Sequence, residues 1–164
     1  MILIVDSGST KSDWIAIDSK KGTHFFEKQR TKGLNPAIIS EQEAHDIINE
    51  NETLIDHKNL VEYVFFYGAG CGTIEAPKML ERVLKSIFTN AKISVKEDTY
   101  AAIYSTIGFE KHAAVVCILG TGSNCTYFDG QNAQQRVISL GLSLIHISEP
   151  TRPRLISYAV FCLK

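Results

Sequence analysis

The first 18 residues constrain the fold of this 164-residue chain most strongly, because they predict a buried strand, a tight polar turn and a second strand. Four apolar residues run into Asp6, and after the turn apolar residues alternate from Trp14 to Ile17. The turn is made of Ser, Gly and Thr, so its backbone N–H groups would point outward and form a cradle for phosphate. Asp6 is well placed to hold Mg²⁺ directly or through water. The alternative is an ordinary hairpin with a serine-rich turn.

The second half of the chain repeats this device. A strand predicted for residues 114–119 runs into a glycine-rich turn at 120–122, and another strand follows from 124 to 129. Both turns carry a Ser/Thr-Gly-Ser core, and both outgoing strands end in Asp. Neither is a Walker or Rossmann motif, because the glycines are incomplete and a strand follows where a helix is required. Two such hairpins on successive lobes suggest a clamp that grips one polyphosphate from two sides.

Composition excludes several classes of protein. The chain is 45% apolar and 21% charged, which is typical of a soluble globular protein, and its net charge of -1 argues against a nucleic-acid partner. Apolar runs are too short to span a membrane, and the N-terminus enters a strand without a signal-peptide pattern. The four cysteines have no Cys-x-x-Cys spacing, which indicates reduced, mostly buried thiols of a cytoplasmic protein.

The expected order of elements is three strands, then alternating helices and strands, then three strands again. A third strand is predicted at 23–29, and a loop at 31–36 follows it. Ser40 and Glu43 form a capping box before a helix, and Pro77 opens a second helix. The remaining predicted strands cover 61–67, 91–95, 114–119, 124–129 and 133–139, and a helix follows Asp98. This order predicts an α/β protein with a mixed sheet, flanking helices and a duplicated fold with a cleft between the copies.

Four motifs, in this order, resemble one family. They are Asp6-Ser7-Gly8-Ser9-Thr10-Lys11, Gly33-Leu34-Asn35-Pro36, Gly68-Ala69-Gly70-Cys71 and Leu119-Gly120-Thr121-Gly122-Ser123-Asn124. The chain resembles the BadF/BadG/BcrA/BcrD-type ATPases over about residues 1–141, especially the N-acetylglucosamine kinase-like branch of the sugar kinase, actin and heat-shock ATPase superfamily. The resemblance implies a ribonuclease H-like (actin-like ATPase) lobe, the start of a second similar lobe, and phosphoryl transfer from ATP with Mg²⁺ to a sugar.

The resemblance also implies a role for each matching residue. Asp98 matches the catalytic carboxylate, which would contact the sugar and accept the proton of its hydroxyl group. The phosphates would face Gly8, Ser9, Thr10, Lys11, Gly120, Thr121 and Gly122, with Asp6 on the metal side, and the sugar would contact Asn35, Ser123 and Asn124. Two alternatives stay open for the carboxylate and the amide. Asp98 could be only a helix N-cap, and Asn35 before Pro36 only a turn former. Glu97 is a rival base, although strand alternation points it to the opposite face.

After Gly141 the chain departs from the family pattern. Residues 142–164 resemble the in-frame translation of a sequencing-library adapter and are interpreted as an artefactual, non-native tail, against the alternative of a genuine β-rich tail. The expected domains are therefore 1–111, an N-terminal actin-like ATPase lobe, and 112–141, the first strands of a truncated second lobe. Such a chain is expected to be inactive by itself.

Three functions remain in competition. The leading interpretation is an ATP-dependent amino-sugar kinase with N-acetylglucosamine as substrate, for which the resemblance leaves open a homodimer of the full-length protein. The second is an ATPase that activates a dehydratase or reductase through an iron–sulfur cluster, which would need cluster-ligating cysteines. The third is a non-catalytic sugar sensor that keeps the clamp without the chemistry.

Overall fold

The computed structural model describes residues 1–108, 112–119, 123–135 and 159–163. The chain divides into two compact units between Asp98 and Thr99. The predicted domain boundary at residue 111 stays a prediction. In the part of the chain that the structure describes, no helix is long and apolar enough to cross a membrane.

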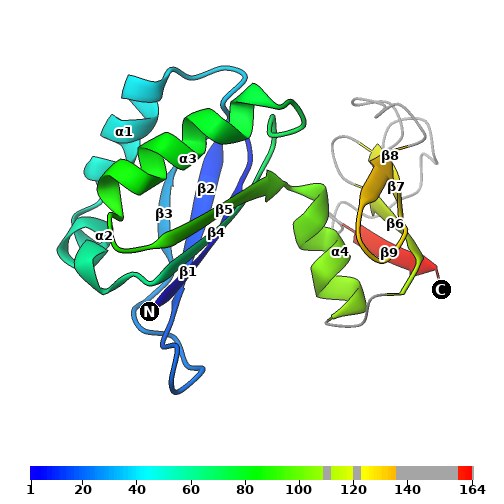
Figure 1. The fold of residues 1–164 in the computed structure, drawn as a ribbon, viewed down its shortest axis with the longest axis horizontal. Helices are drawn as coiled ribbons and strands as arrows, with labels where there is room; N and C mark the ends of the chain where they lie inside the picture. Colours follow the sequence, from blue (N-terminus) through cyan, green and yellow to red (C-terminus); the bar gives the residue numbers. More distant parts are fainter. Residues whose placement is uncertain (109–111, 120–122, 136–158, 164) are drawn as a thin grey trace, which may run out of the picture. The chain divides into compact units, whose positions relative to one another are not determined.

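The first unit contains a five-stranded mixed sheet in the order β3-β2-β1-β4-β5 (Figure 1). Its strands are β1 (Ile2–Ser7), β2 (Lys11–Ile17), β3 (Gln29–Lys32), β4 (Tyr63–Gly68) and β5 (Lys92–Glu97). The β1–β2 and β2–β3 pairs are antiparallel, whereas β1–β4 and β4–β5 are parallel. It follows that β1, β3, β4 and β5 run in the same direction and end at one edge of the sheet.

Alternation along the strands places the core. Leu3 and Val5 of β1, Trp14 and Ala16 of β2, and Phe66 of β4 are fully buried. The ring centroid of Trp14 lies 6.3 Å from that of Phe88, which directly follows the helix Glu75–Ile87. All 20 buried hydrophobic residues of this core lie between Met1 and Val95, so the first unit has a core of its own.

The helices of the first unit are α1 (Glu41–Asn49), α2 (Glu52–Asp56), the 3-10 helix η1 (Lys58–Leu60) and α3 (Glu75–Ile87). The capping box predicted at Ser40 is confirmed, because the Ser40 hydroxyl accepts from the Glu43 N–H and the Glu43 carboxylate accepts from the Ser40 N–H. The amphipathic helix α3 lies across one face of the sheet beside α1 (Figure 1). It begins at Glu75, two residues before the predicted Pro77.

The prediction of a third strand at 23–29 is wrong, as is the prediction of a loop beginning at residue 31. Strand β3 covers Gln29–Lys32, and the segment before it makes one isolated bridge, between His24 and Ile17. The aromatic residues that suggested the earlier strand pack instead against His57, whose ring lies 5.7 Å from Phe25 and 5.4 Å from Phe26. The short helices α2 and η1 were not predicted either. For the aromatic residues a tertiary contact outweighs the local pattern. Helix α2 has a local signal, because the side chain of its N-cap residue Asn51 accepts from Leu54 N–H (3.0 Å).

The second unit consists of α4 (Thr99–Ile107) and a sheet in the order β8-β7-β6-β9. Its strands are β6 (Ala114–Leu119), β7 (Ser123–Phe128), β8 (Ala133–Gln135) and β9 (Ala159–Leu163), and all neighbours are antiparallel. The meander β6-β7-β8 repeats that of β1-β2-β3, as predicted, while residues 136–139 of the third predicted strand lie outside the described residues. Strand β9, from the segment interpreted as a non-native tail, pairs with β6. The origin of that segment stays a prediction.

Candidate functional site

Four segments of the first unit meet where its codirectional strands end. They are the turn at residues 8–10, the loop at 33–37, the glycine-rich turn at 69–72, and the β5 terminus with Asp98. Hydrogen bonds from Ala69 N–H to Ser7 O (2.8 Å) and from Asp98 N–H to Gly68 O (3.2 Å) join three of them. This edge brings together the predicted first phosphate turn, Asn35, Asp6 and Asp98. It lies outside the carboxyl ends of the strands, where open α/β sheets bind ligands.

The turn at residues 8–10 is a tight hairpin turn with solvent-exposed residues. Gly8 N–H donates to Lys11 O (2.9 Å), so this group closes the hairpin and does not point outward as predicted. Within the described residues, the N–H groups of Ser9 and Thr10 have no hydrogen-bond partner and are free to bind an anion. A Cβ atom at Gly8 would meet nothing closer than Lys11 O at 3.8 Å. The fold therefore has room for a side chain here, and the exposed surface beside the turn stays open.

The loop at 33–37 packs directly on that turn. A Cβ atom at Gly33 would lie 2.4 Å from the backbone carbon of Ser9, so only glycine fits. Asn35 is buried, donates from its amide to Ser9 Oγ (2.8 Å) and accepts from Ala37 N–H (2.9 Å). Asn35 therefore forms the turn, which was the alternative to a sugar-binding role, and its side chain also hydrogen-bonds to Ser9. These contacts use one of the two amide hydrogens of Asn35.

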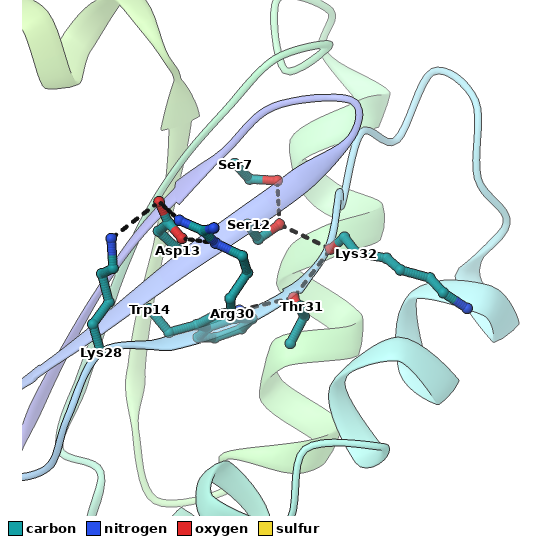
Figure 2. A network of polar contacts seen from close by, with 8 residues as sticks. All are labelled: Ser7, Ser12, Asp13, Trp14, Lys28, Arg30, Thr31 and Lys32. Atoms are coloured by element: carbon teal, nitrogen blue, oxygen red, sulfur yellow. Dashed lines mark hydrogen bonds and ion pairs between the residues drawn. The ribbon is translucent and has the colours of Figure 1, made fainter.

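A chain of buried hydroxyl groups joins the hairpin to this loop (Figure 2). Leu34 N–H donates to Ser7 Oγ (3.0 Å), Ser7 Oγ lies 2.7 Å from Ser12 Oγ, and Ser12 Oγ donates to Lys32 O (3.2 Å). Either hydroxyl group can donate to the other, because Ser7 Oγ also has Gly8 O as an acceptor at 3.3 Å, so both groups are satisfied. Ser7 and Ser12 are 1% and 0% exposed. No role was predicted for these two serines. The available signal was the alternation along β2, which puts Ser12 on the same buried face as Trp14 and Ala16.

The carboxylates at this edge repel one another. Desolvation raises the pKa of Asp6, and the negative charges of Asp98 and Asp13 raise it further, although the side chain is in part exposed. Desolvation and Asp98 also raise the pKa of Glu97. Repulsion of this kind costs stability unless a cation or a proton offsets it, and it is common at functional sites. Glu97 lies close to this cluster, since a Cβ atom at Gly72 would be 3.5 Å from its Oε1. It therefore remains a rival to Asp98.

The donor set fits a magnesium ion only in part. Among the described residues, no group of three potential ligands could hold a metal by itself. Mg²⁺ in phosphotransfer sites is bound by one or two carboxylates, waters and substrate phosphates, so a dedicated cage is not required. Asp6, beside Asp98 and the turn at 8–10, has the chemistry for that arrangement.

Cys71 is the buried thiol of this edge, with 5% exposure. Burial, with the charges of Asp98 and Glu97, raises its pKa to about 12. At neutral pH it is therefore a protonated, unreactive group, as predicted for a packed thiol.

A hollow of about 570 Å³ opens beside the turn. Ser9, Thr10 and Gly33 line one wall, and Glu43, Asp46 and Glu50 of the α1 region line the other. Carboxylates on that wall disfavour the binding of a polyphosphate in this hollow.

The predicted residues of the second hairpin are described only in part. Gly120, Thr121 and Gly122 lie outside the described residues. Ser123 and Asn124 begin β7, opposite Leu119 and Ile118 of β6. A clamp formed by both turns stays a prediction.

The sheet order, the mixture of antiparallel and parallel pairs and the repeated meander define an actin-like ATPase lobe of ribonuclease H-like fold. The chain is similar to a candidate N-acetylglucosamine kinase from Porphyromonas gingivalis, at 34% identity and a TM-score of 0.72 over 84% of this chain and 48% of that one. It thus spans about half the length of that protein. The resemblance to the N-acetylglucosamine kinase-like branch of the sugar kinase and actin superfamily is confirmed.

A second structure supports the fold alone. It is the inorganic polyphosphate/ATP-glucomannokinase from Arthrobacter sp. strain KM, at 16% identity and a TM-score of 0.52, matched over 84% of this chain and 62% of that one. No protein-family model and no curated protein sequence matches the chain.

Proposed function

We propose that these residues belong to an ATP-dependent amino-sugar kinase that phosphorylates N-acetylglucosamine. The observation that carries the proposal is the meeting of Asp6 and Asp98 at the sheet edge where the turn at 8–10 packs on the loop of Asn35. Mutual repulsion of two carboxylates beside free backbone N–H groups suits a site that receives a cation and a phosphate together. The similarity to the P. gingivalis protein supports the substrate class.

The proposed mechanism uses position and charge. Asp98 accepts the proton of the sugar hydroxyl as that oxygen bonds to the γ-phosphorus, and the bond from this phosphorus to the β–γ bridging oxygen breaks, so that ADP leaves. The N–H groups of Ser9 and Thr10, with Lys11, hold the phosphates. Asp6 would hold a magnesium ion, which would supply positive charge to offset that of the phosphates. Asn35 contacts the sugar through its remaining amide hydrogen.

The second hairpin completes the proposed site. Gly120, Thr121 and Gly122 hold the phosphates from the other lobe, and Ser123 and Asn124 add sugar contacts. We place the enzyme in the cytoplasm, where ATP is available, as a homodimer, and we expect the 164-residue chain by itself to be inactive.

The test uses the protein continued through the genomic sequence that follows the codon for Gly141. N-acetylglucosamine should stimulate ADP formation and yield a sugar phosphate detected by mass spectrometry. Asp98→Asn should lower kcat by about 10²–10⁴-fold, the usual worth of a general base, and leave sugar affinity within a few-fold. Glu97→Gln is the matched control and should keep most of the activity.

Three results would count against the proposal or reassign its residues. Unchanged turnover in the Asp98→Asn protein eliminates Asp98 as the base, and loss of activity in Glu97→Gln alone would transfer the role to Glu97. Sugar binding without any ADP formation would favour a sensor.

A further inference from the structure

Two cysteines of the second unit face each other across one hairpin. Cys117 of β6 and Cys125 of β7 are direct partners in the antiparallel register, and their Sγ atoms are 2.9 Å apart. Both thiols are free and only half-buried, whereas Cys71 in the other unit is buried. The prediction of mostly buried thiols therefore holds for Cys71 and not for this pair.

The backbone already satisfies the requirements of a disulfide bond. Directly opposite residues in antiparallel strands have Cα atoms about 4.5 or 5.5 Å apart, inside the range of about 4.4–6.8 Å found for disulfides. The two side chains lie on the same face of the sheet because they are opposite in register. A bond needs only a small approach of the sulfur atoms, with no change of strand register.

We propose that Cys117 and Cys125 are a thiol modification site. By exchange with a small disulfide such as oxidised glutathione, the two cysteines form a reversible disulfide bond with each other. The proposal goes beyond the kinase function and does not depend on it. It requires only the register and the exposure of the β6–β7 hairpin.

The reaction is a pair of thiol–disulfide exchanges. The Cys125 thiolate attacks one sulfur of oxidised glutathione, forms a mixed disulfide and expels one glutathione thiolate. The Cys117 sulfur, after losing its proton, attacks the Cys125 sulfur and expels the second glutathione. The protein loses two electrons and two protons, and oxidised glutathione is reduced to two glutathione molecules.

The order of attack follows from the hydrogen bond between the two thiols. That bond, with partial burial, raises the pKa of Cys117 to about 11, so Cys117 forms a thiolate poorly. Cys125 is therefore the attacking thiol and Cys117 the resolving one. Cys162 of β9 is no direct competitor, because its register partner is Val116.

The experiment uses the 164-residue chain and peptide mass spectrometry. After treatment with oxidised glutathione, acid quenching and alkylation, trypsin releases one peptide, residues 112–136, that holds Cys117 and Cys125 and no other cysteine. We expect this peptide to lose the mass of two hydrogen atoms and to take up no alkyl group. Chymotryptic cleavage after Leu119 should leave its two halves joined until a reductant is added.

Variants separate the pair from the other thiols. Cys117→Ser should trap a stable glutathione adduct on Cys125, Cys125→Ser should leave Cys117 largely alkylated, and Cys71→Ser should keep the link. In urea the preference for this pair should fall toward random pairing of the four cysteines, because the register is lost. Two alkylated thiols in the wild-type peptide, two separate glutathione adducts, or a link that urea does not weaken would each overturn the proposal.

Discussion

Gly8 and Gly33 differ in whether the fold itself requires a glycine. Gly8 has no positive φ angle and has room for a Cβ atom, so nothing in the described fold requires a glycine there. Gly33 lies so close to Ser9 that any side chain would collide with its backbone. Packing therefore requires glycine at position 33, whereas at position 8 only the proposed approach of a phosphate gives glycine a role.

We predict that Gly8→Ala leaves stability within about 1 kcal/mol of the wild-type value, because its φ angle and surroundings accept alanine. In the complete protein the same change should weaken ATP binding at least about tenfold, or ~1.4 kcal/mol, because the methyl group occupies the approach to the turn. Titration calorimetry and urea unfolding would measure the two effects.

Gly33→Ala is the matched control and should lower the free energy of unfolding by about 1–3 kcal/mol through overpacking. Equal loss of stability in both variants would show that Gly8 is structural, and unchanged ATP affinity in Gly8→Ala would exclude this turn as the phosphate site.

A second prediction concerns the charge of Asp6. Its pKa is raised in the folded state, so folded molecules hold this proton at pH values where unfolded ones release it, and stability falls as the pH rises through that window above 3.8. Asp6→Asn should therefore raise stability at neutral pH, by less than about 1 kcal/mol because solvent screens a partly exposed group. The gain should vanish at acid pH, where Asp6 is neutral.

Asp13→Asn provides a control of opposite sign. Its hydrogen bond and ion pair with Arg30 lower the pKa of Asp13, so this carboxylate stabilises the folded state above its ordinary pKa and loses that effect as the pH falls (Figure 2). Urea unfolding of both variants at several pH values, followed by the fluorescence of Trp14, would decide. A destabilised Asp6→Asn protein at neutral pH would contradict the proposed repulsion.

At the scale of elements, the β1–β2 hairpin and the loop after β3 act as one piece. Three sets of contacts hold them together: the β1–β2 backbone pairing, the Ser7–Ser12 hydroxyl chain and the hydrogen bond from Asn35 to Ser9. Trp14 Nε1 also donates a hydrogen bond to Thr31 Oγ1 of β3 (3.0 Å), which joins β2 to β3 through their side chains (Figure 2). A movement of the turn at 8–10 should therefore carry the Asn35 loop with it.

Removal of one hydroxyl group from this chain should be costly. Ser12→Ala removes two hydrogen bonds, one to Ser7 Oγ and one to Lys32 O, although Ser7 Oγ keeps Leu34 N–H and Gly8 O and Lys32 O keeps Thr31 Oγ1. We expect a loss of about 0.5–1.5 kcal/mol in the free energy of unfolding for each bond. Ser7→Ala should cost a similar amount, and the double variant should cost less than the sum, because the two groups share one bond.

The exposed capping serine offers a comparison. Ser40→Ala, outside this network, should cost about 1 kcal/mol and add to Ser12→Ala without coupling. Full additivity of Ser7→Ala and Ser12→Ala in urea unfolding would contradict a shared chain.

For the whole molecule, the two units differ in the size of their cores. The first has 20 buried hydrophobic residues between Met1 and Val95, and the second has a separate cluster of six around α4, β6 and β7. A domain needs enough buried apolar surface to offset the entropy of ordering its chain. The first unit meets that requirement far better than the described part of the second.

We therefore predict that residues 1–98 fold on their own. The fragment should keep helical and strand circular dichroism, and Trp14, the single tryptophan of the chain, should keep the emission of a buried indole. The matching fragment 99–164 should unfold at lower urea concentration. Red-shifted Trp14 emission in the 1–98 fragment would show that its core needs the rest of the chain.

Much of this molecule follows from local patterns. Neighbouring residues predict the alternation in β1 and β2, the capping box at Ser40 and the order of the main strands and helices. The structure confirms these features. The class of fold followed from that order. Local periodicity, caps and turns depend on contacts within a few residues, which a sequence displays directly.

Other features were decided only by the tertiary structure. The position of β3, the structural work of Asn35, the hydroxyl chain of Ser7 and Ser12 and the repulsion between Asp6 and Asp98 all join residues far apart in the chain. Their energies depend on which groups folding buries together, and no local pattern contains that information. The sequence by itself determined the order of the main strands and helices, whereas packing decided the position of β3 and which polar groups share the edge of the sheet.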